Sequence, residues 1–351
     1  MNSLDKSYIK TLENLKITIR NAQLKAALAV NAELIILYWN IGKIILDKQQ
    51  ELGWGTKVVD NLSRDLQQSF PDLKGLSVRN LKYMRKFAEI YSDFSIVQQL
   101  VAQIPWGHNI FLMDKVGAQE ERLWYANKIL ENGWSRNTLM LQIESKLYDR
   151  QTNDNKVNNF SLILPKPQSD LANELIKDPY NFDFLTISEQ ANEKDIEKGL
   201  VKNLKLFLLE LGKGFAFIGE QYHLEIANKD YYLDLLFYNT KLHSYVVFEL
   251  KIGEFLPEYA GKMNFYLNVV DEKLKSEVDN SSIGIILCKS KNKLIAEYSL
   301  RDMTKPIGVA EYTVTQTIPD SIKSNLPTIE ELETSICGNS VSISVISLTR
   351  S

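Results

Sequence analysis

The sequence has few residues of the kinds that build disulfide frameworks or thiolate metal sites. Cys288 and Cys337 are the only cysteines in 351 residues, and their separation matches no metal-ligand spacing. Such sparing use of cysteine is typical of proteins kept in a reducing compartment. The sequence therefore predicts a cytoplasmic protein without disulfides.

Signals for export or membrane insertion are also lacking. The first ten residues, MNSLDKSYIK, contain no apolar signal core. The most apolar windows, such as residues 26–37, are shorter than a bilayer span and interrupted by polar residues. Neither an internal repeat nor a low-complexity segment is found. We expect no membrane partner.

Charge of one sign is not in large excess. The net charge is −3 and the pI is about 5.8. This balance argues weakly against indiscriminate binding of nucleic acid, although a local basic face is enough for phosphate contacts. Residues 1–150 hold 20 basic and 16 acidic side chains, and the rest of the chain is net acidic.

Hydrophobic periodicity divides the chain. Residues 1–150 carry apolar side chains at intervals of three and four, which predicts an all-α domain. The polar run RQTNDNKVNN predicts a linker over residues 151–170. Residues 171–330 begin with one predicted helix over 193–211 and then alternate strand-like and helical patterns, and 331–351 form a tail. The fold class is therefore α + α/β.

The stretch DYYLDLLFYNTKLHSYVVFELK at residues 230–251 places charges where buried strands tolerate few. It predicts two strands joined by a short turn, with Asp234 in the first strand and Glu249 and Lys251 closing the second. Unpaired buried carboxylates are costly and are usually paired or bound to metal. In an antiparallel hairpin the two acids lie side by side, and Glu249 and Lys251 share a face.

This set of residues suits hydrolysis of a phosphodiester. Mg²⁺ prefers hard oxygen ligands and keeps several waters, so Asp234, Glu249 and the Leu250 carbonyl would suffice to hold it, with Mn²⁺ able to replace it. Lys251 can reach the same water or phosphate. Glu-x-Lys is nevertheless a common pattern, and a solvated ion pair on an edge strand would also produce it. The apolar setting of both strands favours the metal site.

Several longer motifs resemble those of one nuclease family. Residues 215–267, with YYLDLLFYN and FELKIGEFLPEYAGKMNFYL, resemble the YhcG-type branch of the PD-(D/E)XK nucleases. The motifs KDPYNFDFL, WNIGKII, LSVRNLKYMRKF and IPWGHNIFLM resemble the same family. The resemblance covers about residues 10 to 325. It implies a restriction-endonuclease-like mixed sheet flanked by helices and Mg²⁺-dependent cleavage of DNA.

The resemblance also assigns roles to individual residues. Asp234, Glu249 and Lys251 match the motif, although Leu233 stands where the motif name has proline. Glu197 sits where the superfamily often places an additional acid, and Gln221 could face the site. Lys262 and Tyr266 replace a Gln and Tyr pair, so Lys262 is expected to contact DNA phosphate.

The helical domain contains a candidate recognition helix. Ser77 can cap a helix on which Arg79, Lys82 and Lys86 share one face with Arg85 beside them, and the preceding helix and turn complete a helix-turn-helix arrangement. A solvated helix face would give the same pattern.

Two functions remain open at this point. The first is a DNA endonuclease, expected as a homodimer, in restriction, defence against foreign DNA or repair. The second is a catalytically silent DNA-binding scaffold associated with restriction-modification proteins. RNA as substrate is a third and minor alternative.

Overall fold

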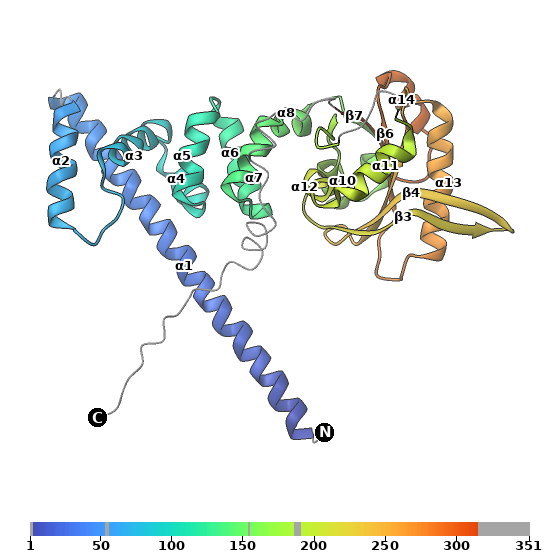
Figure 1. The fold of residues 1–351 in the computed structure, drawn as a ribbon, viewed down its shortest axis with the longest axis horizontal. Coiled ribbons are helices and arrows are strands. Elements are labelled where there is room, and N and C mark those ends of the chain that lie inside the picture. Colours follow the sequence, from blue (N-terminus) through green and yellow to red (C-terminus); the bar gives the residue numbers. More distant parts are fainter. Residues whose placement is uncertain (1–2, 53–55, 154, 186–190, 315–351) are drawn as a thin grey trace. The chain divides into compact units, whose positions relative to one another are not determined.

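The computed structural model describes residues 3–52, 56–153, 155–185 and 191–314, and the predicted tail at 331–351 lies outside them. The chain forms two compact units, Met1–Ile143 and Glu144–Ser351. Figure 1 shows helices alone in the first unit and a sheet with helices in the second. The fold class expected from the sequence, an all-α region followed by a mixed sheet flanked by helices, is confirmed.

The first unit is all-helical over the residues described. Its elements are α1 (Ser3–Leu52), α2 (Thr56–Ser69), α3 (Val78–Ile90), α4 (Phe94–Gln99), the 3₁₀-helix η1 (Val101–Gln103), α5 (Trp106–Lys115), α6 (Gln119–Asn132) and α7 (Arg136–Glu144).

The second half of α1 is anchored against α3 and its neighbours. A Cβ on Gly42 would lie 1.9 Å from the Met84 carbonyl oxygen, so only glycine allows α1 and α3 to approach this closely. The Trp39 indole donates to the Tyr91 carbonyl oxygen at 2.7 Å. The expected cap of α3 is present, because the Ser77 hydroxyl accepts from the Asn80 backbone N–H.

One described helix, α1, is long and apolar enough over Tyr8–Leu52 to cross a membrane by length and composition alone. A core helix of a soluble protein meets the same criterion. Ile35 and Ile45 of this segment are buried within the helical unit.

The second unit is built on one sheet. Its elements are α8 (Leu147–Thr152), β1 (Val157–Asn158), α9 (Phe160–Ile163), α10 (Gln168–Leu175), β2 (Tyr180–Asn181), α11 (Glu193–Lys202), α12 (Leu204–Leu211), β3 (Phe215–Ile226), β4 (Lys229–Asn239), β5 (Ser244–Leu250), α13 (Pro257–Lys273), β6 (Ile283–Cys288), α14 (Lys293–Leu300) and β7 (Ile307–Thr313).

The strands follow the order β1-β7-β6-β5-β4-β3, with β2 beside β7. β3, β4 and β5 are antiparallel, as the predicted hairpin requires, whereas β5, β6 and β7 are parallel. Residues of α10, α11 and α12 pack on one face of the sheet, and residues of α13 and α14 pack on the other (Figure 1). β5 therefore lies inside the sheet with helices on both sides.

Two predicted segments differ from the structure. Within the predicted linker, Val157 pairs with Val309 of β7 and Phe160 is fully buried, so these isolated apolar residues tie the polar run to the sheet. The predicted helix over 193–211 is instead two helices, α11 and α12. They separate at Asn203, whose side-chain amide donates to the Gly199 carbonyl oxygen and ends α11.

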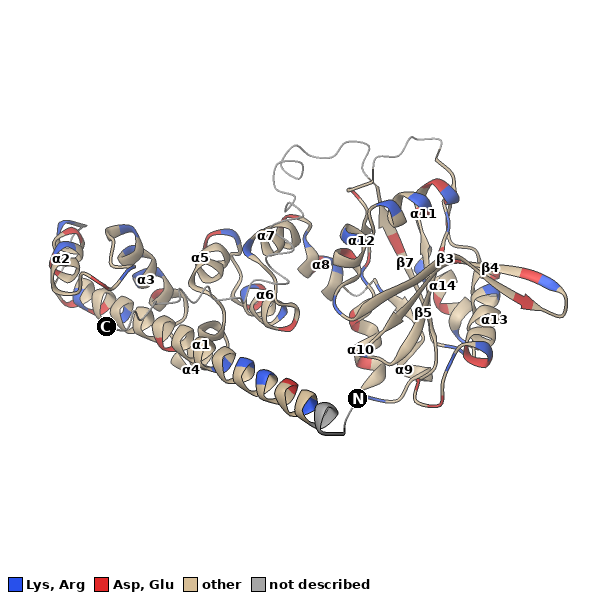
Figure 2. Ribbon diagram, turned by 60° about the horizontal axis from the view of Figure 1, so that its bottom comes forward, with Lys and Arg blue, Asp and Glu red and all other residues tan. Residues whose placement is uncertain are grey.

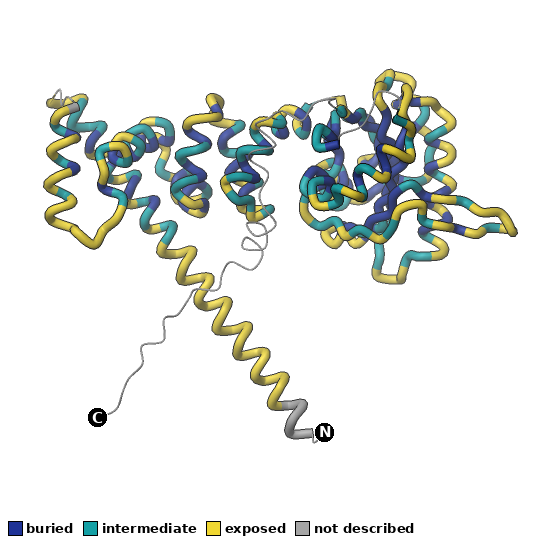
Figure 3. Tube along the Cα trace, viewed as in Figure 1, coloured by how far each residue is buried: buried dark blue, intermediate teal, exposed yellow. Residues whose placement is uncertain are grey.

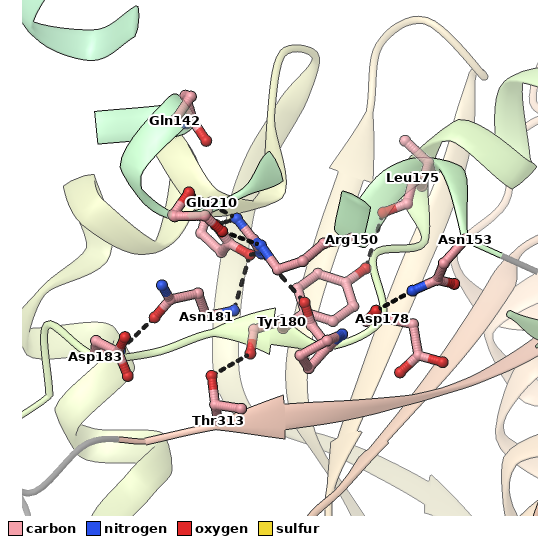
Figure 4. Close-up of polar contacts among 12 residues, drawn as sticks. Gln142, Arg150, Asn153, Leu175, Asp178, Tyr180, Asn181, Asp183, Glu210 and Thr313 are labelled. Carbon is pink, nitrogen blue, oxygen red and sulfur yellow. Dashed lines mark hydrogen bonds and ion pairs between the residues drawn. The ribbon is translucent and has the colours of Figure 1, made fainter. Parts of the chain in front are cut away.

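A buried ion pair joins α8 to α12 within the second unit (Figure 4). The Arg150 guanidinium donates to both carboxylate oxygens of Glu210 and also to the backbone carbonyls of Ser145 and Pro179. Glu210 Oε1 also accepts from the backbone N–H of Asn181, the last residue of β2. The pair thus fixes the first residues of the second unit onto its core.

Glu210→Ala should lower the free energy of unfolding of the second unit by about 3–5 kcal/mol, because it leaves the Arg150 charge buried and unpaired. Urea unfolding measures this change. Asp230→Ala, which removes the exposed partner of His223, is the matched control and should cost less than about 1 kcal/mol. Equal losses for the two variants would contradict the role given to Arg150.

Candidate active site

Asp234 closes the hydrogen-bonded ladder between β4 and β5. The register ends at Leu235 opposite Phe248, and beyond it Asp234 Oδ2 accepts from the Leu250 backbone N–H at 2.8 Å. A side-chain carboxylate therefore takes the place of the next backbone acceptor. This contact brings Asp234 next to Glu249, as the sequence predicts.

Glu249 is the most deeply buried acid of the site. It is 2% exposed, and its Oε1 contacts the ammonium groups of Lys262 from α13 and, at 3.2 Å, of Lys251. Its Oε2 is buried and has no hydrogen-bond partner. An unsatisfied buried carboxylate oxygen costs about 1–3 kcal/mol, so this atom marks a place where a ligand would be stabilising.

Lys251 is held from several sides at the end of β5. Its Nζ lies 2.7 Å from the Leu250 carbonyl oxygen, 3.2 Å from Glu193 Oε2, and 5.5 Å from the centre of the Tyr259 ring. The Tyr312 hydroxyl donates to the Lys251 carbonyl oxygen. The ammonium group is thus fixed beside both Glu249 and the Leu250 carbonyl.

Gln221 and Glu197 also reach this point. The amide of Gln221 donates to Glu197 Oε2 at 2.8 Å and to Asp234 Oδ1 at 3.4 Å. Gln221 has a φ of 45°, which costs a residue with a side chain about 1–2 kcal/mol. The strained backbone in β3 directs the amide at two carboxylates from different elements, as expected of residues at functional sites.

The pKa values of two acids of the site, Asp234 and Glu197, are raised, which favours their neutral forms. Burial, followed by the adjacent Glu249 carboxylate, raises the pKa of Asp234 above its usual range. Burial raises the pKa of Glu197 to about 7. For Lys251, burial alone would lower the pKa, but the charges of Glu249, Asp234 and Glu193 outweigh it and raise the pKa, so the ammonium stays charged.

The donor atoms fit a hard divalent cation. Among the residues that the structure describes, no group of three or more Asp, Glu, His or Cys side chains is arranged to hold a metal ion. Mg²⁺ needs only one or two carboxylates besides water and substrate oxygens. Glu249 Oε2, the Asp234 carboxylate and the Leu250 carbonyl meet that need, and the ammonium groups of Lys251 and Lys262 balance part of the acidic charge.

Glu193 is a residue of the site that the motifs do not reveal. It lies at the start of α11, is 40% exposed at its side chain, and pairs with Lys251 across 58 positions of sequence. One signal was present in the sequence, because Glu193 and Glu197 are four apart and share a helical face. Its partner could be identified only from the fold.

Family comparisons cover most of the chain. The YhcG PDDEXK nuclease domain matches residues 173–327, and the DUF1016 N-terminal domain matches residues 14–150. An Escherichia coli (strain K12) protein, "Putative nuclease YhcG", is 29% identical over 328 residues, 84% of this chain and 87% of its own length.

The chain is thus similar over both of its halves to YhcG-type PD-(D/E)XK nucleases. Residues 173–327, within the second unit, match the nuclease domain, and PDDEXK nucleases generally use divalent metal ions. The family assignment made from the sequence motifs is thereby confirmed.

Comparison with solved structures found partial matches. A repair endonuclease from Pyrococcus abyssi is 17% identical with a TM-score of 0.24, and an EndoMS complex with double-stranded DNA is 16% identical with a TM-score of 0.26. The matches cover 37% and 38% of this chain and about half of each solved chain, 49% and 48%.

The basic residues of α3 divide into two groups by their contacts. Arg79 and Lys82 are exposed. Arg85 instead donates to Gln49, and Lys86 pairs with Asp114 at 2.8 Å. Two of the four predicted DNA contacts are therefore engaged within the helical unit.

Two other residues from the sequence motifs, Lys262 and Trp106, contact residues of their own unit. Lys262, predicted to contact DNA, lies against Glu249 and over the ring of Tyr266. Trp106 of the IPWGHNIFLM motif packs edge-on against Tyr38 and Phe87.

Replacing Asp234 should stabilise the metal-free nuclease domain at neutral pH. Between the unfolded-state pKa of about 3.9 and the raised folded-state pKa, only the folded state keeps the proton, so wild-type stability falls as pH rises through this range. Asp234→Asn removes that loss, so its free energy of unfolding should exceed that of the wild type by about 1–3 kcal/mol at pH 7.5 but by little at pH 4.

Thermal unfolding at pH 7.5 and pH 4 measures this gain in stability, and unfolding with and without Mg²⁺ tests whether Asp234 binds the cation. Mg²⁺ should raise the unfolding temperature of the wild type but not of Asp234→Asn, since a ligand of the folded state stabilises it. Asp230→Asn, an exposed change on the same strand, should behave as the wild type. A Mg²⁺ shift that persists in Asp234→Asn would remove Asp234 from the cation site.

Proposed function

We propose that this chain is a Mg²⁺-dependent DNA endonuclease that hydrolyses phosphodiester bonds. The observation that carries the proposal is the partnerless Oε2 of Glu249, buried beside Asp234 and Lys251 at the positions of the PD-(D/E)XK motif. A buried carboxylate oxygen without a partner is costly, and a bound cation would offset that cost. The similarity to "Putative nuclease YhcG" over most of the chain supports a nuclease, and DNA is the substrate class that the family motifs imply.

Asp234, Glu249 and the Leu250 carbonyl would hold the ion. When bound, Mg²⁺ supplies charge neutralisation at the phosphoryl oxygens and lowers the pKa of water. Side chains of the protein contact the phosphate, orient the attacking water and accept its proton. Lys251, kept charged by its acidic neighbours, donates to a phosphoryl oxygen and orients the attacking water.

Glu197 is suited to hold the proton that the water loses. Its Oε1 is buried without a hydrogen-bond partner, and its pKa of about 7 lies near the pH at which a general base works best. Gln221 keeps Glu197 beside Asp234 by donating to both carboxylates. The two acids of the motif and this third acid thus have separate tasks.

The helical unit is proposed to bring the nuclease domain to DNA. Arg79 and Lys82 on α3 are exposed and able to contact phosphates, and α2, the turn and α3 supply the order of a helix-turn-helix. The roles of Arg85, Lys86 and Lys262 in DNA binding stay predictions, as do the homodimer, restriction-modification partners and a cytoplasmic location.

Nicking of supercoiled plasmid tests the chemistry. With Mg²⁺, the wild type should cut, and Asp234→Ala and Lys251→Ala should each slow cutting at least about a hundredfold, because each removes charge stabilisation at the phosphate. Asp230→Ala is the matched control, an exposed carboxylate four residues from Asp234 on the same strand, and should cut at the wild-type rate.

The rate should also fall as pH is lowered through about 7, because Glu197, the proposed base, becomes protonated. Metal-dependent cutting that survives both substitutions would overturn the site. DNA binding without cutting of any DNA form would favour the scaffold function instead.

A further inference from the structure

An apolar stripe runs along the outer face of α1. All residues from 8 to 30 are exposed (Figure 3), and many of them are large and apolar. Tyr8 is 68% exposed, Ile19 57% and Val30 69%. A helix this apolar and uncovered lacks the partner that its sequence requires.

The large apolar residues Ile9, Ile17, Leu24 and Leu28 are exposed away from this stripe. Nine other apolar residues of α1 share one face of the helix. Their positions advance in steps of three or four as far as Val30 and then in steps of seven, the spacing of a coiled-coil seam. We call them the outer stripe: Tyr8, Leu12, Leu15, Ile19, Ala22, Ala26, Val30, Leu37 and Ile44.

The outer stripe stays open along the anchored half of α1. Glu33, Leu37, Asn40 and Ile44 are among the exposed positions there, whereas Ile35, close to the opposite side of the helix, is fully buried against the helical unit. The stripe therefore continues past the residues that pack on α3, from Tyr8 to Ile44.

We propose that the outer stripe binds the outer stripe of a second copy of this chain, with the two α1 helices antiparallel. Antiparallel pairing about a two-fold axis at Ala26 places Leu15 of one copy opposite Leu37 of the other, and Tyr8 opposite Ile44. In the same register Val30 meets Ala22, whereas Leu12 meets Asn40 and Ile19 meets Glu33 of the other copy. Ala22 and Ala26 lie at the centre, where small side chains let the two backbones approach.

Charge favours this orientation. Residues 8–30 contain four basic side chains and one acidic, so this half carries a net charge of +3, whereas residues 31–52 contain two basic and three acidic, a net charge of −1. Figure 2 shows the mainly basic bands along the N-terminal half of α1. Antiparallel pairing sets the basic half against the acidic half, whereas parallel pairing would set two basic halves together.

The length of the stripe is sufficient for a stable pair. Residues 8 to 44 span about 55 Å of helix, or about five heptads, and three to four heptads are typical of a coiled coil. The seam is self-complementary, as a two-fold interface requires.

A membrane surface fits the stripe less well. Asn31 donates to the Ala102 and Ile104 carbonyls, and Trp39 donates to the Tyr91 carbonyl, so the later part of the apolar segment is committed to the helical unit. The charged residues of the free half lie on the side opposite the outer stripe, but the exposed Ile17, Leu24 and Leu28 lie among them, so this side is not the strongly polar face of an interfacial helix.

The mass of the full chain in solution tests the pairing. Analytical ultracentrifugation should find a dimer for the wild type. The double variant Leu15→Glu, Ile19→Glu should weaken the dimer at least about a hundredfold, because four charges enter the seam of each dimer. The matched control Asn14→Glu, Asn21→Glu adds the same charges on another side of the helix and should remain dimeric.

Circular dichroism shows whether the variants keep their helices, as expected of substitutions at exposed positions. A monomeric wild type at micromolar concentration would overturn the proposal. So would equal weakening by the two double variants.

Cross-linking tests the orientation. In a chain carrying Cys288→Ser and Cys337→Ser, Ala26→Cys should form a disulfide-linked dimer on mild oxidation. Leu15→Cys alone and Leu37→Cys alone should not, because antiparallel pairing separates equivalent positions by about 33 Å. A mixture of the last two should form a mixed dimer.

If Leu15→Cys formed a disulfide-linked dimer alone, and its mixture with Leu37→Cys gave no mixed dimer, the helices would be parallel. That result would contradict the antiparallel assignment. Sedimentation with anionic phosphatidylserine vesicles tests whether the outer stripe binds a membrane surface instead. Binding of a monomer to vesicles, lost in Leu15→Glu, Ile19→Glu, would replace the second copy by a membrane surface. Nicking by the nuclease domain is measured separately, so failure of this pairing leaves the proposed chemistry standing.

Discussion

The burial of Glu249 inside the sheet is the constraint on which the rest of the site depends. A carboxylate that is 2% exposed is stable only if cations surround it. α13 must therefore pack so that Lys262 reaches Glu249, and β5 must end so that Lys251 turns back toward it. Even then Oε2 is left without a partner, and the fold retains a place for one more positive charge.

This arrangement explains why acids and bases of the site come from separate elements. Asp234 occupies the end of the β4 and β5 ladder, whereas Glu193 and Glu197 come from α11 and Gln221 from the strained part of β3. Each group fixes another's position, so the lysine stays charged, while the raised pKa values of Asp234 and Glu197 favour their neutral forms. The result is a site whose electrostatics favour entry of a cation.

The sequence predicts the parts of this site that follow from local periodicity. Alternating apolar residues around Asp234 and Glu249 predict adjacent strands, and the structure has the two acids side by side. The pairing of Glu193 with Lys251 spans 58 positions, and the positive φ of Gln221 depends on its two carboxylate partners. Contacts of this kind arise only from packing of distant elements. The break of the predicted helix at Asn203 likewise depends on a side-chain cap rather than on periodicity.

A crystal structure of the chain with Mn²⁺ in place of Mg²⁺ tests the central claim most directly, because anomalous scattering locates the ion independently of activity. The account predicts one ion bound by Glu249 Oε2, the Asp234 carboxylate and the Leu250 carbonyl, with the Lys262 ammonium moved away from Glu249. An ion bound elsewhere, or no ion with the Lys262 and Glu249 pair intact at saturating Mn²⁺, would contradict it.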